Sequence, residues 1–147
     1  MVERLRPEYW RAWRELRLRA LAESPDAFGS TYEENLRVTA QTWQRRARAF
    51  AVPAGDRAMF VAIDQARGEW IGCAGAHVDP GGIPNLISMW VAPEHRGRGV
   101  GSSLVGAVIG WARAPRRCPG TRTWWRTKWC SGSGSERSGR CHAEPVS

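Results

Sequence analysis

Residues 86–112 read LISMWVAPEHRGRGVGSSLVGAVIGWA, and the stretch holds three structural signals in succession. The apolar run 86–91 predicts a strand, which Pro93 ends because proline has no N–H to donate to a ladder. Segment 96–101 places a glycine at every second position, as a tight turn requires. Apolar side chains then recur at helical spacing, at Leu104, Val105, Val108, Ile109 and Ala112. The stretch therefore predicts a strand, a glycine-rich turn and a helix.

A glycine-rich turn that leads into a helix N-terminus is typical of an anion site. The N–H groups of the first helical turn have no acceptor within the helix, and the helix dipole adds positive potential there. Glycines let the backbone approach a phosphate, and Arg96 and Arg98 add charge. A tight turn with solvated arginines explains the same residues, so the pattern alone leaves both interpretations open.

Two common phosphate-binding motifs fit this turn poorly. A P-loop requires a lysine after its last glycine, but Gly101 is followed by Ser102. The dinucleotide fingerprint, counted from Gly97 and Gly99, requires a glycine at position 102 and a parallel strand–helix–strand unit. Neither motif identifies the ligand.

Two helices are predicted upstream of the strands. The first begins at Pro7 and ends at Ser24, and one of its faces holds Tyr9, Trp13, Leu16 and Ala20. The second begins after Ser30 or Thr31, where glutamates three residues later complete a capping box. Its apolar stripe runs to Phe50 and is interrupted by Thr39 and Ala40.

Two further strands are predicted between these helices and residue 86. Residues 59–63 and 70–78 are apolar runs separated by a short turn that contains Gly68, which favours an antiparallel hairpin. The expected order is therefore two helices, three strands, the glycine-rich turn and a helix.

With this element order, the segment Arg96-Gly97-Arg98-Gly99-Val100-Gly101 resembles the GNAT superfamily of acyl-CoA-dependent N-acetyltransferases, whose pyrophosphate motif is Gln/Arg-x-x-Gly-x-Gly/Ala. Residues 87–95 look like the family's central strand and following turn, and residues 18–21 and 25–29 look like its first helical region. The resemblance implies an α/β fold of the α+β type, with a mixed, mainly antiparallel sheet flanked by helices.

The resemblance also implies a ligand and a reaction. Acetyl-CoA would be the co-substrate, with its pyrophosphate on the N–H groups around Arg98 to Ser102 and its pantetheine arm along the strand that ends at Val91. A substrate amine, on a small molecule or a peptide, would attack the acetyl carbonyl directly, and no metal is expected. The candidate binding residues are Trp90, Val91, Arg96, Gly97, Arg98, Gly99, Val100, Gly101 and Ser102.

Glu33 and Glu34 are the candidates for the catalytic base. In the resembling family this region lines the acceptor side. The same two residues fit the simpler role of helix caps and first-turn charges, because carboxylates stabilise a helix N-terminus.

The chain changes character after Arg113. Residues 1–113 carry 15 basic and 12 acidic side chains, whereas residues 114–147 carry 7 and 2, so the tail supplies most of the net charge of +8. The tail has no Leu, Ile, Met, Phe or Tyr, and such a composition cannot build an apolar face. We therefore expect an acetyltransferase-like domain over residues 1–113, incomplete at its C-terminal end, and a disordered, non-homologous tail over residues 114–147.

One hypothesis for the tail is translation in a shifted frame or an unrelated join. The 21 arginines and single lysine suggest a GC-rich coding sequence, and the strand and tyrosine-bearing helix typical of the family are not visible after Ala114. A natural disordered tail is the alternative. Sequencing the gene would separate them, since a restored frame should encode the missing strand and helix.

The sequence also bears on metal binding, alternative functions, localisation and oligomeric state. The spacing of Cys118, Cys130, Cys141 and His142 is poor for zinc, so no metal site is predicted. Tryptophans among basic residues of the tail leave a nucleic-acid-binding protein as an alternative, and an inactive acetyl-CoA-binding remnant is another. The charged N-terminus and the lack of a long apolar run favour a cytoplasmic protein without a membrane span. An exposed sheet edge would allow a homo-oligomer.

Overall fold

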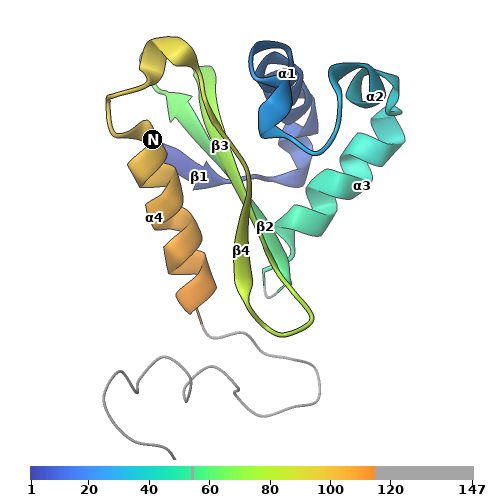
Figure 1. Cartoon of the computed structure of the whole chain (residues 1–147), viewed down its shortest axis with the longest axis vertical. Coiled ribbons are helices and arrows are strands. Elements are labelled where there is room, and N and C mark those ends of the chain that lie inside the picture. Colours follow the sequence, from blue (N-terminus) through green and yellow to red (C-terminus); the bar gives the residue numbers. More distant parts are fainter. Residues whose placement is uncertain (54, 115–147) are drawn as a thin grey trace, which may run out of the picture. The chain divides into compact units, whose positions relative to one another are not determined.

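The computed structural model describes residues 1–53 and 55–114 (Figure 1). One antiparallel sheet has the strand order β1-β2-β3-β4, with β1 at Val2–Arg4, β2 at Arg57–Asp64, β3 at Glu69–Val78 and β4 at Pro84–Val91. The helices are α1 (Trp10–Glu23), α2 (Tyr32–Arg37), α3 (Ala40–Ala51) and α4 (Val100–Arg113). Three short 3-10 turns lie at Pro7–Tyr9, Pro25–Ala27 and Pro93–His95.

The sheet is covered on both faces, and β2 shows how the sequence achieves this. Successive side chains of a strand point to opposite faces. Met59 and Val61 pack in a cluster with residues of α1 and α3. The alternate residues Ala58, Phe60 and Ala62 pack in a second cluster with Leu104 and Val108 of α4. The two layers of helices lie on either side of the sheet in Figure 1, with α4 alone on one side.

The predicted hairpin is confirmed, since β2 and β3 pair antiparallel in the register Phe60↔Ala74. The sequence did not predict β1, because three residues that include Glu3 and Arg4 form no readable pattern. This strand depends on long-range contacts: it pairs with β2, and the N-terminal ammonium donates to the Ile63 carbonyl at 2.8 Å.

The single helix predicted after Thr31 is wrong, because the structure contains two. Val38 is extended between α2 and α3, and the Thr39 side chain accepts a hydrogen bond from the Thr42 N–H at 3.2 Å. Threonine is favoured at such N-caps, where its hydroxyl satisfies a free N–H. The capping box of Thr31 and Glu34 at the start of α2 is confirmed.

The first predicted helix is confirmed in position, with one difference on its apolar face. Trp13, Leu16 and Ala20 are buried, but Tyr9 is 39% exposed and lies edge-on against Trp70. In the described residues, no helix is long and apolar enough to cross a membrane. The predicted tail falls almost entirely on residues 115–147, which lie outside the described residues.

Candidate functional site

The N-terminus of α4 carries no side-chain cap. Gly99 is the N-cap residue with φ +79°, and the first hydrogen bond closing the turn runs from the Ser103 N–H to the Gly99 carbonyl at 3.0 Å. The N–H groups of Val100, Gly101 and Ser102 precede that bond and therefore have no acceptor within the helix. Together with the helix dipole, they form a group of donors suited to an anion.

The glycines keep these donors accessible. Gly97 and Gly99 both have positive φ, and a Cβ built on either would meet no atom within 4 Å. Side chains there would be strained and would extend into the space in front of the helix. At Gly101 an added Cβ would lie 3.2 Å from the Met89 Cε on β4, so the end of the Met89 side chain would have to shift.

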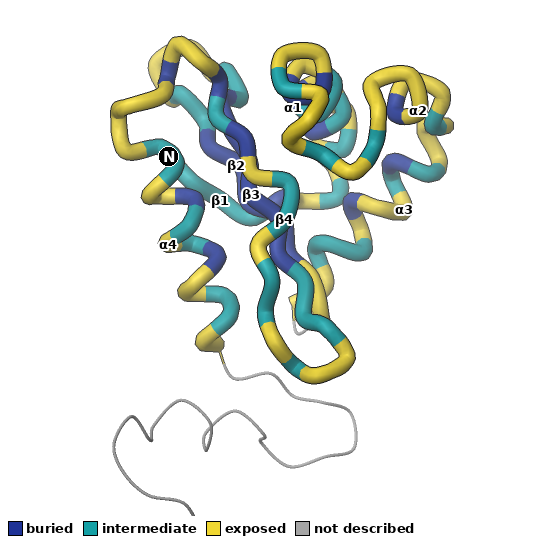
Figure 2. The backbone as a smooth tube through the Cα atoms, in the orientation of Figure 1, coloured by how far each residue is buried: buried dark blue, intermediate teal, exposed yellow. Residues whose placement is uncertain are grey.

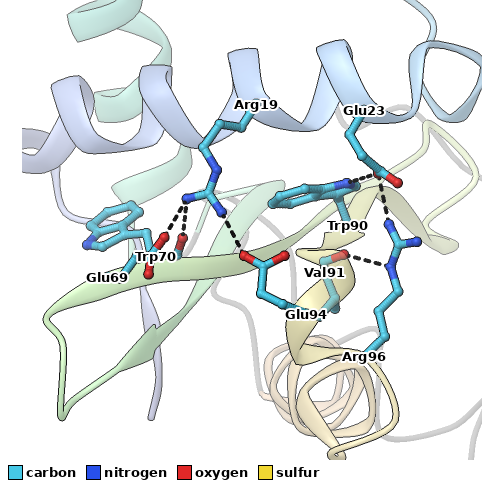
Figure 3. Close-up of polar contacts among 8 residues, drawn as sticks. All are labelled: Arg19, Glu23, Glu69, Trp70, Trp90, Val91, Glu94 and Arg96. Atoms are coloured by element: carbon cyan, nitrogen blue, oxygen red, sulfur yellow. Dashed lines mark hydrogen bonds and ion pairs between the residues drawn. The ribbon is translucent and has the colours of Figure 1, made fainter.

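The two arginines of the turn differ in their contacts, and Figure 3 shows those of Arg96. The Arg96 Nε donates to the Val91 carbonyl at 2.9 Å, and its terminal nitrogen lies 2.9 Å from the Glu23 Oε2. The Arg96 guanidinium is thus held against the protein and partly neutralised. Arg98 is exposed, at the tip of the turn. The family resemblance makes both arginines candidate ligands of the anion. Both are exposed, but Arg96 is paired with Glu23 and the Val91 carbonyl, whereas no contact with another described side chain holds Arg98.

β4 is the edge strand of the described sheet, and Figure 2 shows it as the most exposed of the three long strands. The Ala92 N–H donates to the Ile71 carbonyl at 2.8 Å, so Val91, one residue earlier, directs its main-chain groups to the opposite edge. The hydrogen bond from Arg96 to the Val91 carbonyl confirms that orientation. The Val91 N–H therefore lies on the open edge, close in sequence to the donors of α4.

A bulge distorts β4 just before this point. Ile87 pairs with Gly75 and Trp90 pairs with Cys73, so β4 has one residue more than β3 between the two pairs. Ser88 takes up the difference with φ +53°, unusual for a residue with a side chain. Cys73 is buried in the core, and this burial raises the pKa of its thiol to about 12, which disfavours the reactive thiolate.

Glu23 connects three parts of the site. Its Oε2 accepts hydrogen bonds from the Ser24 hydroxyl, from the Trp90 indole N–H at 2.8 Å and from Arg96 at 2.9 Å. These donors, Ser24 first, lower the pKa of the Glu23 carboxyl to about 2. The role of Glu23 was not predicted from the sequence, because no local pattern relates position 23 to positions 90 and 96.

We expect the stabilising effect of the Glu23 charge to disappear in acid. Its folded-state pKa of about 2 lies below the ordinary value of 4.5, so its contribution is complete above pH 4.5 and is lost as the pH falls toward 2. Denaturant unfolding of the wild type and of Glu23→Gln should therefore give free-energy differences that are constant near neutrality and shrink between pH 4.5 and 2. A difference that stays constant down to pH 2 would contradict this assignment.

Glu33 and Glu34 line an open groove formed by the end of α1, the turn at Pro25–Ala27 and the start of α2. The Glu34 carboxylate accepts the Thr31 N–H at 2.8 Å and is committed to the capping box. Glu33 is exposed beside it. The turn at Pro25–Ala27 also contacts β4, so the groove adjoins the strand that carries Val91.

Comparison with known proteins identifies the class of the chain. A model of the acetyltransferase (GNAT) family matches residues 3–129. The chain belongs to this family. The match continues past Arg113, the predicted end of the domain. Residues 115–129 lie outside the described residues.

Solved structures of acetyltransferases share the fold. AAC(6′)-Iy in complex with the bisubstrate analogue CoA-S-monomethyl-acetylneamine aligns at 24% identity and a TM-score of 0.53, over 76% of this chain and 69% of its own. Glucosamine-6-phosphate N-acetyltransferase from Arabidopsis thaliana aligns at 14% identity and a TM-score of 0.55, over 76% of this chain and 72% of the neighbour. A GNAT acetyltransferase from Streptococcus pneumoniae aligns at 16% identity and a TM-score of 0.59, over 78% of this chain and 67% of the neighbour. No curated protein matched the chain.

These findings confirm the predicted fold class and family. Helices flanking a four-stranded antiparallel sheet match the fold of the GNAT neighbours, and membership of the family supports acyl transfer. Within the described residues, no group of three or more His, Cys, Asp or Glu side chains could hold a metal ion.

Proposed function

We propose that this GNAT protein transfers an acetyl group from acetyl-CoA to a primary amine of a small molecule or peptide. The observation that carries the proposal is the uncapped N-terminus of α4, which directly follows the open edge of β4. An anionic pyrophosphate fits the N-terminus of α4. An extended arm that ends in a carbonyl group fits the open edge of β4. The AAC(6′)-Iy structure holds a CoA-containing ligand, which supports the choice of co-substrate.

The residues of the site fit acetyl-CoA as follows. The N–H groups of Val100, Gly101 and Ser102 would hold the pyrophosphate, with Arg98 as the accessible cation. Gly97 and Gly99 leave the space that the phosphates need. Of the two β4 residues predicted to bind, Val91 presents its main chain to the open edge. The Trp90 indole is buried and bound to Glu23, so we assign Trp90 to shaping the site from the core.

Acetyl-CoA, when bound, supplies an acetyl group activated as a thioester. The Val91 N–H, on the open edge, is the donor that would stabilise negative charge on the acetyl oxygen during attack. The attacking amine must first lose a proton to a base or to water leading to one. We propose Glu33 for this role in preference to Glu34, because Glu34 is held in the capping box.

Substitution of the two glutamates should distinguish these roles. Glu33→Gln should lower kcat by about 100-fold, in the range typical of losing a general base, and should leave the free energy of unfolding nearly unchanged. Glu34→Gln should change neither kcat nor the free energy of unfolding by much, since glutamine also completes a capping box. Steady-state rates across pH 6–9 and denaturant unfolding provide both readouts. If both variants keep wild-type rates, neither residue is the base.

The proposal is tested by thermal unfolding of the full chain with acetyl-CoA and by acetyl transfer to a panel of amines. Acetyl-CoA at 100 times its Kd should stabilise the protein by about 2.7 kcal/mol, whereas ATP should stabilise it far less. No shift at millimolar acetyl-CoA would contradict the proposal. Stabilisation without turnover of any amine would favour the inactive remnant. The nucleic-acid-binding alternative concerns residues 114–147, and no described residue favours it.

A further inference from the structure

Two side chains one turn apart on α1 hold the end of β4 and the turn that follows it (Figure 3). Glu23 contacts Trp90 and Arg96, as described above. Arg19 donates to the Glu69 carboxylate at 3.2 Å and to the Trp70 carbonyl at 3.1 Å, and lies 3.6 Å from the Glu94 carboxylate. Both residues therefore attach α1 to the sheet, but only Glu23 reaches the first residue of the anion turn.

Arg96 links Glu23 to the candidate site, because its guanidinium binds both the Glu23 carboxylate and the Val91 carbonyl. Its guanidinium is planar, so its orientation is fixed when the Nε binds the Val91 carbonyl and a terminal nitrogen binds Glu23. The Val91 carbonyl lies on the same open edge as the Val91 N–H that we assign to the acetyl oxygen. Arg96 thus connects that edge to the start of the turn that holds the pyrophosphate.

Without the carboxylate, Arg96 would have little reason to remain there. Its side chain is 49% exposed, and a single hydrogen bond to a carbonyl would compete with water and with a bound phosphate. A released guanidinium could reach toward the anion, but it would leave the Val91 carbonyl unpaired and the first residue of the turn free to reorient.

We propose that Glu23 is a positioning residue of the acyl-CoA site, which holds the Arg96 guanidinium against the Val91 carbonyl and so fixes the 96–102 turn relative to the β4 edge. The inference rests on the proposed function, because it assigns the turn and the edge to two ends of one ligand. It also assigns Arg98, and not Arg96, as the arginine that contacts phosphate.

The experiment compares full-length variants by two independent readouts. Glu23→Gln, Arg96→Gln and the double variant test the pair, and Glu94→Gln is the matched control, since it removes an α1 ion pair two residues from Arg96. The first readout is the Kd for CoA by calorimetry. The second, which needs no ligand, is proton exchange by NMR at the Arg96 Nε–H and the Ser103 N–H.

We expect Glu23→Gln and Arg96→Gln each to weaken CoA binding about five- to tenfold, and the double variant to be no weaker than either, because both changes break one interaction. Glu94→Gln should stay within about twofold of the wild type. The Arg96 Nε–H should exchange faster in Glu23→Gln but not in Glu94→Gln, and the Ser103 N–H should follow the same pattern.

Two results would overturn the inference: wild-type CoA affinity in Glu23→Gln, or additive losses in the double variant. If the wild type itself does not bind CoA, the proposed function fails, and the exchange data alone decide the positioning role. Faster exchange of the Ser103 N–H confined to the Glu23 and Arg96 variants then supports it. Equal exchange of this N–H in Glu23→Gln and Glu94→Gln overturns it.

Discussion

Gly99→Val should weaken CoA binding by at least tenfold, while Gly68→Val should leave the affinity unchanged. Gly99 is the N-cap of α4 with φ +79°, a conformation that a β-branched residue avoids. Relief of that strain would turn the N–H groups of Val100 to Ser102 away from a common anion. Loss of one charge-assisted hydrogen bond is worth about 1.5–3 kcal/mol, which corresponds to about ten- to 100-fold in Kd.

Gly68 is the matched control for this substitution. It has φ +66° in the β2–β3 turn, and a Cβ there also meets no atom within 4 Å. Both variants should therefore lose stability by a similar amount, of about 1–3 kcal/mol. Calorimetry with CoA and denaturant unfolding separate the two effects. Equal CoA affinity in Gly99→Val and Gly68→Val would show that the turn does not bind the cofactor's phosphates.

Gly72→Val should give the largest loss of stability, because β3 at this position leaves no room for a side chain. A Cβ on Gly72 would lie 2.9 Å from the Trp90 carbonyl oxygen and 3.2 Å from the Leu104 Cδ1. Overpacking of this kind costs about 1–3 kcal/mol, and more where backbone must move. The strand that would have to move is β4, so CoA binding should weaken as well.

Gly106→Ala on α4 is the control for added volume. Gly106 is exposed, nothing lies within 4 Å of its added Cβ, and alanine is the better helix former by about 0.5–1 kcal/mol. Urea unfolding should therefore show opposite signs for the two substitutions. Wild-type stability in Gly72→Val would contradict the close packing of β3 against β4 and α4.

The features predicted from sequence are those encoded by neighbouring residues. The strand at 86–91, the turn at 96–101 and the helix from residue 100 are visible because apolar spacing and glycines act locally. The capping box at Thr31 is likewise contained in four residues. The break between α2 and α3 falls where the apolar stripe is interrupted, at Thr39 and Ala40. The stripe resumes at Trp43 with helical spacing, so the pattern predicts one helix, although Thr39 carries the local signal for a new cap.

Features that depend on distant residues could not be predicted in this way. β1 exists because β2 pairs with it across more than fifty residues of sequence. The contacts of Glu23 with Trp90 and Arg96 join α1 to the far end of the sheet. From its place in the motif, Arg96 was predicted to offer its charge to the anion. In the structure its guanidinium binds Glu23 instead.

Titration of the isotope-labelled protein with CoA, followed by amide NMR, tests the central claim most directly. The account predicts that the largest shifts fall on the N–H groups of Val100, Gly101 and Ser102 at the start of α4, with a second set at Val91 on the β4 edge. The Gly68 turn should not respond. Saturating CoA that leaves these amides unchanged, or that shifts only residues elsewhere, would contradict the assignment of this turn and edge to acetyl-CoA.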